Sequence, residues 1–295
     1  MAAKAEKSVA NVISLFGTEP EIDEDENSVG IVPANTAARA APRVADLVDL
    51  TGKPKVWLTI GRGKTGKTML IRFAVEETMS EGRQVLLADV DRTNATLASY
   101  FEGVQRPPEG DESTVATWLE KLLTFTMQQK VSAYIDLGGG DTTLRRLVAE
   151  VHDLVLMLET AGVAVVAAYL LGPQTDDLSP LATLERAGFQ PAATALVLNE
   201  GLIEAALPRE EAFARVLRHS AFRDAVGRGA VALWMPRLLP VAEIEARRVL
   251  FGNAAVGVMR EGRKQTPLGP FDQGRTRVWL DTMRAEFTPV RSWIA

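Results

Sequence analysis

The sequence contains no cysteine and only two histidines, His152 and His219. A chain without cysteine forms no disulfide, offers no thiolate to a metal and has no cysteine nucleophile. Two histidines are also too few for a histidine-rich metal site. These absences exclude disulfide-stabilised scaffolds, thiolate metal centres and cysteine enzymes.

Long, uninterrupted apolar segments are missing as well. Residues 1–17 contain no extended apolar core and no obvious cleavage site, so a secretory signal is not expected. The most apolar run, Leu154–Gly172, is interrupted by Glu159 and Gly162, and its second half is rich in β-branched residues. This pattern indicates a helix end followed by a buried parallel strand rather than a membrane span. We therefore expect a cytoplasmic protein without a membrane segment.

Negative charge is concentrated at one end of the chain. Residues 1–50 hold nine acidic and four basic side chains and include a small-residue stretch of linker composition, which predicts an acidic, disordered tail. An apolar group at positions 9–16 leaves a second reading open, in which the tail is a docking peptide for a protein partner. We divide the remainder into a main domain, 51–272, and a C-terminal helix within 273–295 that docks on the body.

Strand-like and helix-like segments alternate from residue 55 onward. Short apolar segments predict strands at 55–60, 84–90, 131–137, 163–171, 193–199 and 230–235. Helical patterns follow at 66–80, 113–129, 142–161, 177–187, 208–219, 241–251 and 274–290, with Ser113 or Thr114 as the N-cap of the second. This alternation predicts a three-layer α/β fold, with helices on both faces of a mostly parallel sheet.

A glycine-rich motif joins the first predicted strand to the first predicted helix. Residues Gly61, Arg62, Gly63, Lys64, Thr65, Gly66, Lys67 and Thr68 match the phosphate-binding pattern G-x-x-x-x-G-K-[ST] in full. The glycines allow backbone N–H groups to face the phosphates, and the following helix adds its positive N-terminal end. Lys67 is expected to reach the β- and γ-phosphates and Thr68 to bind Mg²⁺. The motif predicts a P-loop NTPase domain.

Two later strands end in carboxylates that suit a metal and a water molecule. The third predicted strand carries Asp136 at the Walker B position, and Gly138 and Gly139 then place flexible backbone where a γ-phosphate would lie. The second predicted strand carries Asp89, and Asp91 follows on the same side. We expect Asp136 at the metal, and either Asp89 or Asp91 at metal-bound water or at the attacking water.

The pattern for guanine recognition is missing, so adenine is the expected base. A Ras-like GTPase carries N-K-x-D after a late strand, whereas this chain has Asn199, Glu200 and Gly201 there, without the carboxylate that reads guanine.

The order of a P-loop, a strand ending D-x-D, a strand ending in aspartate with a glycine loop, and a strand ending L-N resembles the ParA/MinD superfamily of deviant Walker A ATPases. The resemblance extends over about residues 55–252. It implies an ATP-dependent switch that dimerises face to face around ATP. It also implies that Asp91 positions the attacking water, that Asp89 belongs to the metal shell, that Asn199 contacts adenine and that Pro236 lies beside the base.

Two loops depart from the pattern of that family. Its loop usually reads K-G-G-x-G-K-[ST], with a signature lysine that crosses the dimer, whereas this chain has Arg62 there and Lys64 in place of a second glycine. Arginine also suits phosphate, so Arg62 is a candidate catalytic residue in trans. The loop after Asp136 is glycine-rich here instead of proline-containing. The departures indicate a divergent branch that resembles ATPases encoded beside plasmid mobilisation or stability genes.

Three functions are compatible with these motifs. The first is an ATP-driven switch in plasmid partition, mobilisation or cargo positioning, with slow, partner-stimulated hydrolysis and ATP-dependent homodimers. The second is a small-molecule kinase with Arg247 and Arg248 in a phosphate lid. The third is a nucleotide-binding scaffold subunit without useful turnover. Residues 201–264 hold eleven basic and seven acidic side chains, which either neutralise DNA phosphates or form an ion-paired helix surface.

Overall fold

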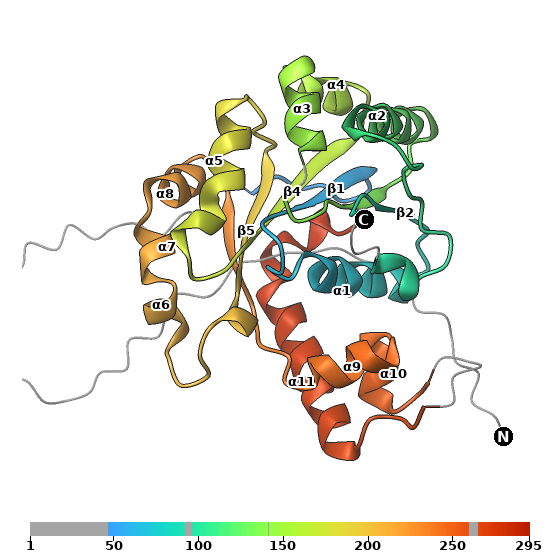
Figure 1. Cartoon of the computed structure of the whole chain (residues 1–295), viewed down its shortest axis with the longest axis vertical. Coiled ribbons are helices and arrows are strands. Elements are labelled where there is room, and N and C mark those ends of the chain that lie inside the picture. The colour runs from blue at the N-terminus through green and yellow to red at the C-terminus, as the bar shows by residue number, and fades with distance from the viewer. Residues whose placement is uncertain (1–46, 92–95, 141, 260–264) are drawn as a thin grey trace, which may run out of the picture.

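The computed structural model describes residues 47–91, 96–140, 142–259 and 265–295, and Figure 1 shows how they are arranged. Most of the expected acidic tail, including the apolar group at positions 9–16, lies outside the described residues. Its last residues contact the body, because the Val48 carbonyl accepts a hydrogen bond from Trp293 Nε1 at 2.8 Å and Leu50 is buried in the core. In the described ranges, no helix has the combined length and apolar character that crossing a bilayer demands.

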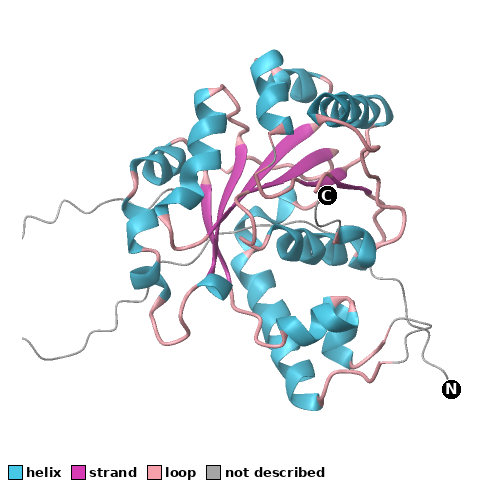
Figure 2. Ribbon diagram, in the orientation of Figure 1, coloured by secondary structure: helices cyan, strands magenta, loops and turns pink. Residues whose placement is uncertain are grey.

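Six strands form one sheet in which all neighbouring pairs are parallel (Figure 2). The strands are β1 (Lys55–Ile60), β2 (Leu86–Asp89), β3 (Ala133–Asp136), β4 (Ala164–Leu171), β5 (Ala193–Asn199) and β6 (Val231–Met235). Their order across the sheet is β2-β3-β1-β4-β5-β6. The chain therefore builds on one side of β1 first and then crosses to the other side at β4. Ligands of open α/β sheets bind at the carboxyl ends of the strands near such a reversal.

Helices cover both faces of this sheet (Figure 1). One face is covered by α1 (Lys67–Ser80), α9 (Val241–Arg247), α10 (Phe251–Val256) and α11 (Pro270–Glu286). The other is covered by α2 (Glu112–Gln129), α3 (Thr143–Glu150), α4 (Leu154–Thr160), α5 (Ser179–Arg186), α7 (Ala214–Arg218) and α8 (Ser220–Gly227). Short turns of helix complete the chain at η2 (Leu97–Ser99), η3 (Thr175–Leu178), η4 (Glu200–Leu202), α6 (Arg209–Ala212) and η5 (Thr288–Trp293). These three layers confirm the predicted α/β fold of P-loop NTPase type.

The strands are buried on both faces of the sheet. Along β4 all eight residues are buried, and successive side chains alternate between the two cores. A strand that is covered on both faces has a continuous apolar sequence, because neither face meets water. The apolar run Leu154–Gly172 is thus helix α4 followed by strand β4, as the sequence indicated.

The predicted helix at 142–161 is wrong as a single element. The structure has α3 and α4 there, separated by Val151–Asp153. Both helices pack on the same core, so the apolar pattern continues across the break although the residues between them are weak helix formers. The N-cap of α2 also differs from the prediction. It is Asp111, whose carboxylate accepts the Thr114 N–H at 2.8 Å.

Two helices were not expected from the sequence. The predicted helix at 208–219 is divided between α6 and α7, and α8 follows with His219 as its N-cap, its Nδ1 accepting the Ala221 N–H at 3.2 Å. The predicted helix at 241–251 ends at Arg247, because Arg248 adopts a left-handed φ of 49°, and α10 begins at Phe251. The last helix, α11, begins four residues before the predicted 274, so the predicted domain boundary at 272 falls inside it.

Candidate functional site

The loop between β1 and α1 is packed too closely to admit a side chain at Gly61 or at Gly66. Gly66, the residue before α1, has a φ of 100°, and a Cβ on it would lie 2.5 Å from Asn199 Nδ2 and 2.9 Å from Met235 Cε. A Cβ on Gly61 would lie 2.8 Å from the Leu170 carbonyl oxygen. Space at both positions, and the backbone conformation at Gly66, therefore require glycine.

Lys64 stands where the family that the sequence resembles usually has a second glycine. The structure shows how the loop accommodates this lysine. The residue has a left-handed backbone with a φ of 65° and an exposed side chain. A residue other than glycine in this conformation costs roughly 1–2 kcal/mol. The loop thus retains the turn that glycine would favour, and it carries an extra positive charge on its outer surface.

Lys67 lies across the inside of the loop. Its ammonium donates hydrogen bonds to the carbonyl oxygens of Arg62 at 2.9 Å and Gly61 at 3.2 Å, and the side chain is buried. Thr65 Oγ1 donates to the same Arg62 carbonyl at 2.9 Å. The ammonium is therefore held beside the N-terminus of α1, where the helix end and the lysine both favour an anion.

Thr68 and Asp136 meet at the first turn of α1. Thr68 Oγ1 donates to Asp136 Oδ2 at 2.6 Å, and Thr59 Oγ1 donates to Asp136 Oδ1 at 2.9 Å. Burial raises the pKa of Asp136, and the two hydroxyl donors act against that rise. The sequence reasoning missed Thr59, although a hydroxyl within the otherwise apolar segment KVWLTI was a signal for it.

Asp89 lies next to Asp136, because β2 and β3 pair with these two residues in register. Burial, and secondly the neighbouring Asp136, raise the pKa of Asp89 to about 6. Its two carboxylate oxygens accept the backbone N–H groups of Asp91 and Leu97, each at 3.1 Å. Asp89 thus organises the segment that carries Asp91, in addition to lying beside the Walker B position.

The loop after β3 closes against both the phosphate loop and Asp91. A Cβ on Gly139 would lie 2.4 Å from Gly63 Cα, so the two loops touch through backbone. A Cβ on Gly138 would lie 3.4 Å from Asp91 Cγ. The structure therefore brings together the glycine loop, Asp91 and the P-loop at one edge of the sheet.

Arg62 interacts within its own chain. Its guanidinium lies 3.5 Å from Asp177 Oδ1 and 3.8 Å from Asp176 Oδ2, both on η3 after β4. About half of the Arg62 side chain is exposed, whereas Asp177 is buried and also accepts the Gly172 N–H at 3.1 Å. Sequence reasoning found Arg62 but not its carboxylate partners, since β4 and η3 meet the loop only through the fold.

Asn199 ends β5 beside the loop, and Pro236 follows β6, whose last residue Met235 contacts the loop at Gly66. The Asn199 side chain bridges two backbones, donating to the Thr65 carbonyl at 2.9 Å and accepting the Gly201 N–H at 2.8 Å. The Pro236 carbonyl accepts a hydrogen bond from Trp279 Nε1 at 2.8 Å. Asn199 therefore braces the P-loop in this structure, and its contact with adenine remains a prediction.

A charged cluster that the sequence reasoning missed lies at the same strand ends. Arg209 forms ion pairs with Glu200 and Glu286, each at 3.2 Å, and with Glu210 at 3.0 Å. Its guanidinium lies 4.7 Å from the centroid of the Trp234 ring. No local sequence motif predicts this cluster, because its members come from η4, α6, β6 and α11.

Seven arginines within residues 201–264 are the candidates for neutralising DNA phosphates, and the structure shows which of them form ion pairs. They are Arg209, Arg215, Arg218, Arg223, Arg228, Arg247 and Arg248. Arg209, Arg228 and Arg247 pair with glutamates, the last two with Glu185 and Glu243. Arg215, Arg218, Arg223 and Arg248 are exposed. Pairing with glutamates thus neutralises part of the predicted basic surface, and DNA binding remains a prediction.

The residues at this site fit a nucleotide with magnesium. The loop admits no Cβ at Gly61 or Gly66, which is the form of a backbone cradle for phosphate. Beside it, a hydroxyl on Thr68 and carboxylates on Asp89 and Asp136 form a set of hard oxygen donors of the kind that Mg²⁺ prefers.

Comparison with known proteins gives only distant similarity. No protein-family model matches the chain, and no curated protein matches it. Among solved structures, cell division protein FtsY from Thermotoga maritima is 15% identical with a TM-score of 0.42, covering 80% of this chain and 72% of that one. The MinD cell division protein from Aquifex aeolicus is 14% identical with a TM-score of 0.41, covering 79% and 96%. Similarity at this level carries no functional argument.

The sheet order and the loop geometry of the chain itself define its class. It has a P-loop nucleotide-binding fold, with a six-stranded parallel sheet and the glycine loop at the carboxyl end of β1.

Proposed function

We propose that the chain binds ATP with Mg²⁺ at Gly61–Thr68 and hydrolyses it slowly as a nucleotide-dependent switch. The observation that carries the proposal is the 2.6 Å hydrogen bond between Thr68 and Asp136, at a strand end that Asp89 shares. Thr68 with these two carboxylates would hold Mg²⁺, which when bound neutralises charge on the β- and γ-phosphates.

The chain's own residues supply the other roles. Lys67, now bonded to two loop carbonyls, would donate to the γ-phosphate and stabilise charge that develops on it. The loop amides and the N-terminus of α1 would bind the remaining phosphate oxygens. Asp91, beside Gly138, would orient the attacking water and receive its proton.

The contact between Gly139 and Gly63 supports a switch. Any movement of the phosphate loop must be accommodated by the loop after β3, because their backbones leave no space between them. A γ-phosphate that binds one loop would therefore shift the other. Such a shift would alter the surface that a partner meets.

The finer features of the proposal rest on the order of the motifs. They are adenine recognition by Asn199 and Pro236, an ATP-dependent homodimer with Arg62 acting in trans, an activating protein partner, and a role in plasmid partition, mobilisation or cargo positioning. Arg62 would have to leave Asp176 and Asp177 to reach across a dimer. Asn199 would have to release the Thr65 carbonyl to read a base with its amide nitrogen.

One observation favours a small-molecule kinase as the second candidate. A cavity of about 230 Å³ adjoins Gly61 and Arg62, and an acceptor held there would lie next to the phosphate loop. Phosphate release without any added acceptor supports the switch, whereas ATP consumption that requires an acceptor supports the kinase. Nucleotide binding without any turnover of wild-type protein would support the scaffold reading.

The test compares two lysines of the same loop. Lys67→Ala should weaken binding of a fluorescent ATP analogue by about 10- to 100-fold, since a charged hydrogen bond is worth ~1.5–3 kcal/mol and each 1.4 kcal/mol is tenfold. Lys64→Asn is the matched control, because asparagine tolerates the left-handed backbone and Lys64 is exposed. It should change binding by no more than about threefold, in keeping with a surface charge.

Two results would overturn the proposal. One is binding by Lys67→Ala that is as tight as binding by Lys64→Asn and by wild type, which would place the phosphates elsewhere. The other is tighter binding of the matching GTP analogue, which would exclude the adenine assignment. Phosphate release by wild type and by Asp91→Ala, measured at saturating ATP–Mg²⁺, then separates binding from hydrolysis.

A further inference from the structure

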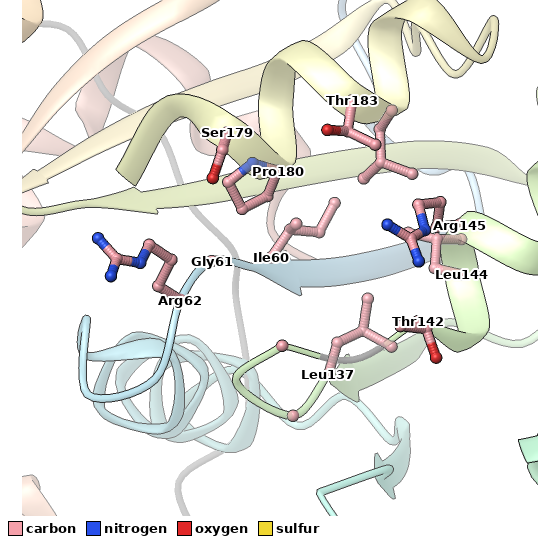
Figure 3. A pocket seen from close by; sticks show the side chains of 13 residues that line it. Ile60, Gly61, Arg62, Leu137, Thr142, Leu144, Arg145, Ser179, Pro180 and Thr183 are labelled. Carbon is pink, nitrogen blue, oxygen red and sulfur yellow. The ribbon is translucent and has the colours of Figure 1, made fainter. Parts of the chain in front are cut away.

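A cavity of about 230 Å³ lies beside the phosphate loop, between the ends of β1 and β3 and the helices α3 and α5 (Figure 3). Its floor is apolar and is formed by Ile60, Leu137, Leu144, Pro180 and Leu184. The volume lies below the range of roughly 300–1,000 Å³ that is usual for ligand pockets. It suits a ligand smaller than a typical drug-sized molecule.

This cavity is distinct from the phosphate site. Gly61 and Arg62 line it, whereas Lys67, Thr68 and Asp136 are not among its described lining residues. The backbone contact of Gly139 with Gly63 closes the loop after β3 onto the P-loop. The side chains that would hold a second small molecule, those of Arg145 and the apolar floor, thus differ from the side chains that would hold the phosphates.

The polar groups around the cavity favour a negative charge. Figure 3 shows the Arg145 guanidinium directed from α3 toward the space between Ile60 and Thr183, with Arg62, which pairs with Asp176 and Asp177, on the opposite side. Hydroxyls of Thr183 and Ser179 come from α5, and that of Ser179 already donates to the Asp176 carbonyl at 2.7 Å. Among the described lining residues no side chain is a carboxylate; Asp141, which follows Gly140 in the chain, lies outside the described residues.

Arg145 differs from its neighbour in what it contacts. Arg146 is held by Glu150, with Nε 2.7 Å from Oε1. For Arg145 no ion pair is formed with any carboxylate in the described ranges, and its side chain is exposed toward the cavity. A cation over an apolar floor, with hydroxyls opposite, is the arrangement that recognises an organic acid by its charge and its body together.

We propose that this cavity binds a small organic monoanion, a carboxylate with an apolar ring or short chain. Arg145 binds the carboxylate, the Thr183 hydroxyl of α5 donates at its edge, and the apolar body rests on the leucines and Ile60. Binding does not require nucleotide, because none of these side chains is among those proposed to hold the phosphates.

The test uses benzoate as the probe and nuclear magnetic resonance of the isotope-labelled, nucleotide-free full chain as the readout. Sodium benzoate should shift the amide signals of Gly138, Gly140 and Thr183. Arg145→Gln should weaken benzoate at least about tenfold, as expected for loss of a charged hydrogen bond. Arg146→Gln is the matched control on the same helix and should leave benzoate affinity unchanged within about twofold, since its ion pair is exposed.

Neutral and inorganic probes separate the parts of the proposal. Benzyl alcohol tests the need for charge and inorganic phosphate tests the need for the apolar body, so both should bind at least about tenfold more weakly than benzoate. Equal binding of benzyl alcohol, stronger binding of phosphate, or equal benzoate affinity in Arg145→Gln would each overturn the proposal.

The outcome is independent of the proposed nucleotide function. Lys67→Ala should bind benzoate like wild type even when it no longer binds nucleotide, because Lys67 does not belong to the cavity wall. If nucleotide binding fails but benzoate binds through Arg145, the proposed function falls and this site stands. If nucleotide binds and benzoate does not, this site falls and the proposed function stands.

Discussion

Helix α1 carries two sets of buried charged residues, and they differ in what surrounds them. At its first turn, Lys67 lies inside a glycine loop whose outer residues are exposed. Farther along, Arg72 and Glu76 are also buried, but their partners belong to the interior. The Glu76 carboxylate accepts the N–H groups of Phe251 and Gly252, each at 2.8 Å.

Arg72 completes the second set. Its guanidinium donates to the Val249 carbonyl at 3.1 Å and lies 3.5 Å from the centroid of the Tyr100 ring and 4.3 Å from that of Phe251. These contacts join α1 to the start of α10 and to the segment after β2. Buried charge alone therefore does not identify a binding site. The first set differs because Lys67 lies within a loop of tightly packed glycines whose outer residues are exposed, so that a ligand can reach it.

The largest expected effect separates the two sets by stability. Glu76→Ala should lower the free energy of unfolding by about 3–5 kcal/mol, because it leaves Arg72 without its buried counter-charge and two backbone N–H groups without an acceptor. Urea denaturation measures the change. Glu81→Ala is the control near the end of the same helix. Its ion pairs with Arg83 and Arg291 are exposed, so the expected loss is below about 1 kcal/mol.

The proposed difference between the two sets of charges is contradicted if Glu76→Ala is as stable as Glu81→Ala. It is also contradicted if folded Glu76→Ala loses nucleotide binding while its stability is unchanged, since that would make Glu76 part of the nucleotide site.

A smaller effect concerns pH. Burial raises the pKa of Glu76 to about 7, from an ordinary value of 4.5, although Arg72 and the two N–H donors act in the opposite direction. Between pH values of about 4.5 and 7 the folded protein thus holds a proton that the unfolded chain has released. The free energy of unfolding should therefore fall as pH rises through this window.

Glu76→Gln should flatten that dependence, because glutamine does not titrate. Denaturation of wild type and variant at a series of pH values, without magnesium, measures the two slopes. Asp89, with its pKa raised to about 6, adds a slope of the same sign in both proteins, so the difference between them reports Glu76. Parallel slopes in the two proteins would contradict the assignment.

The smallest expected effect on stability belongs to Arg62. Its pairs with Asp176 and Asp177 are long and partly exposed, so Arg62→Ala should change the free energy of unfolding by less than about 1 kcal/mol. Light scattering then tests its role in trans, with Asp91→Ala as the background that slows hydrolysis. An ATP-dependent dimer in Asp91→Ala that is lost in the double variant supports that role, and a dimer that persists excludes it.

The part of the site that the sequence predicts is the part formed by local patterns. Gly61–Thr68 is one continuous motif, and Asp89 and Asp136 end apolar strands, so the parallel sheet brings them to one edge. Helix α10 could not be found in this way. Its N-terminus has no local side-chain cap and is instead bonded to Glu76, 175 residues earlier.

The same reason explains the missed partners. Arg62 pairs with η3, Arg209 pairs with Glu286, and Asn199 bonds to Thr65, and each contact joins distant parts of the chain. Residue type indicated that these side chains matter, but the identity of each partner depends on how the sheet order folds the loops together. The proposed role of Asn199 illustrates the limit, since its observed contact is with the P-loop backbone.

The order of the strands also has a consequence for how the protein is made on the ribosome. Strand β1 is synthesised first, but its neighbours in the sheet are β3 and β4, and β2 can pair only after β3 has come between them. Residues 55–60 and 86–89 must therefore emerge and wait without sheet partners until about residue 136 has left the exit tunnel. Exposed apolar strands of this kind invite aggregation during synthesis. Nascent chains arrested before β3 should thus depend on chaperones far more than chains arrested after β4.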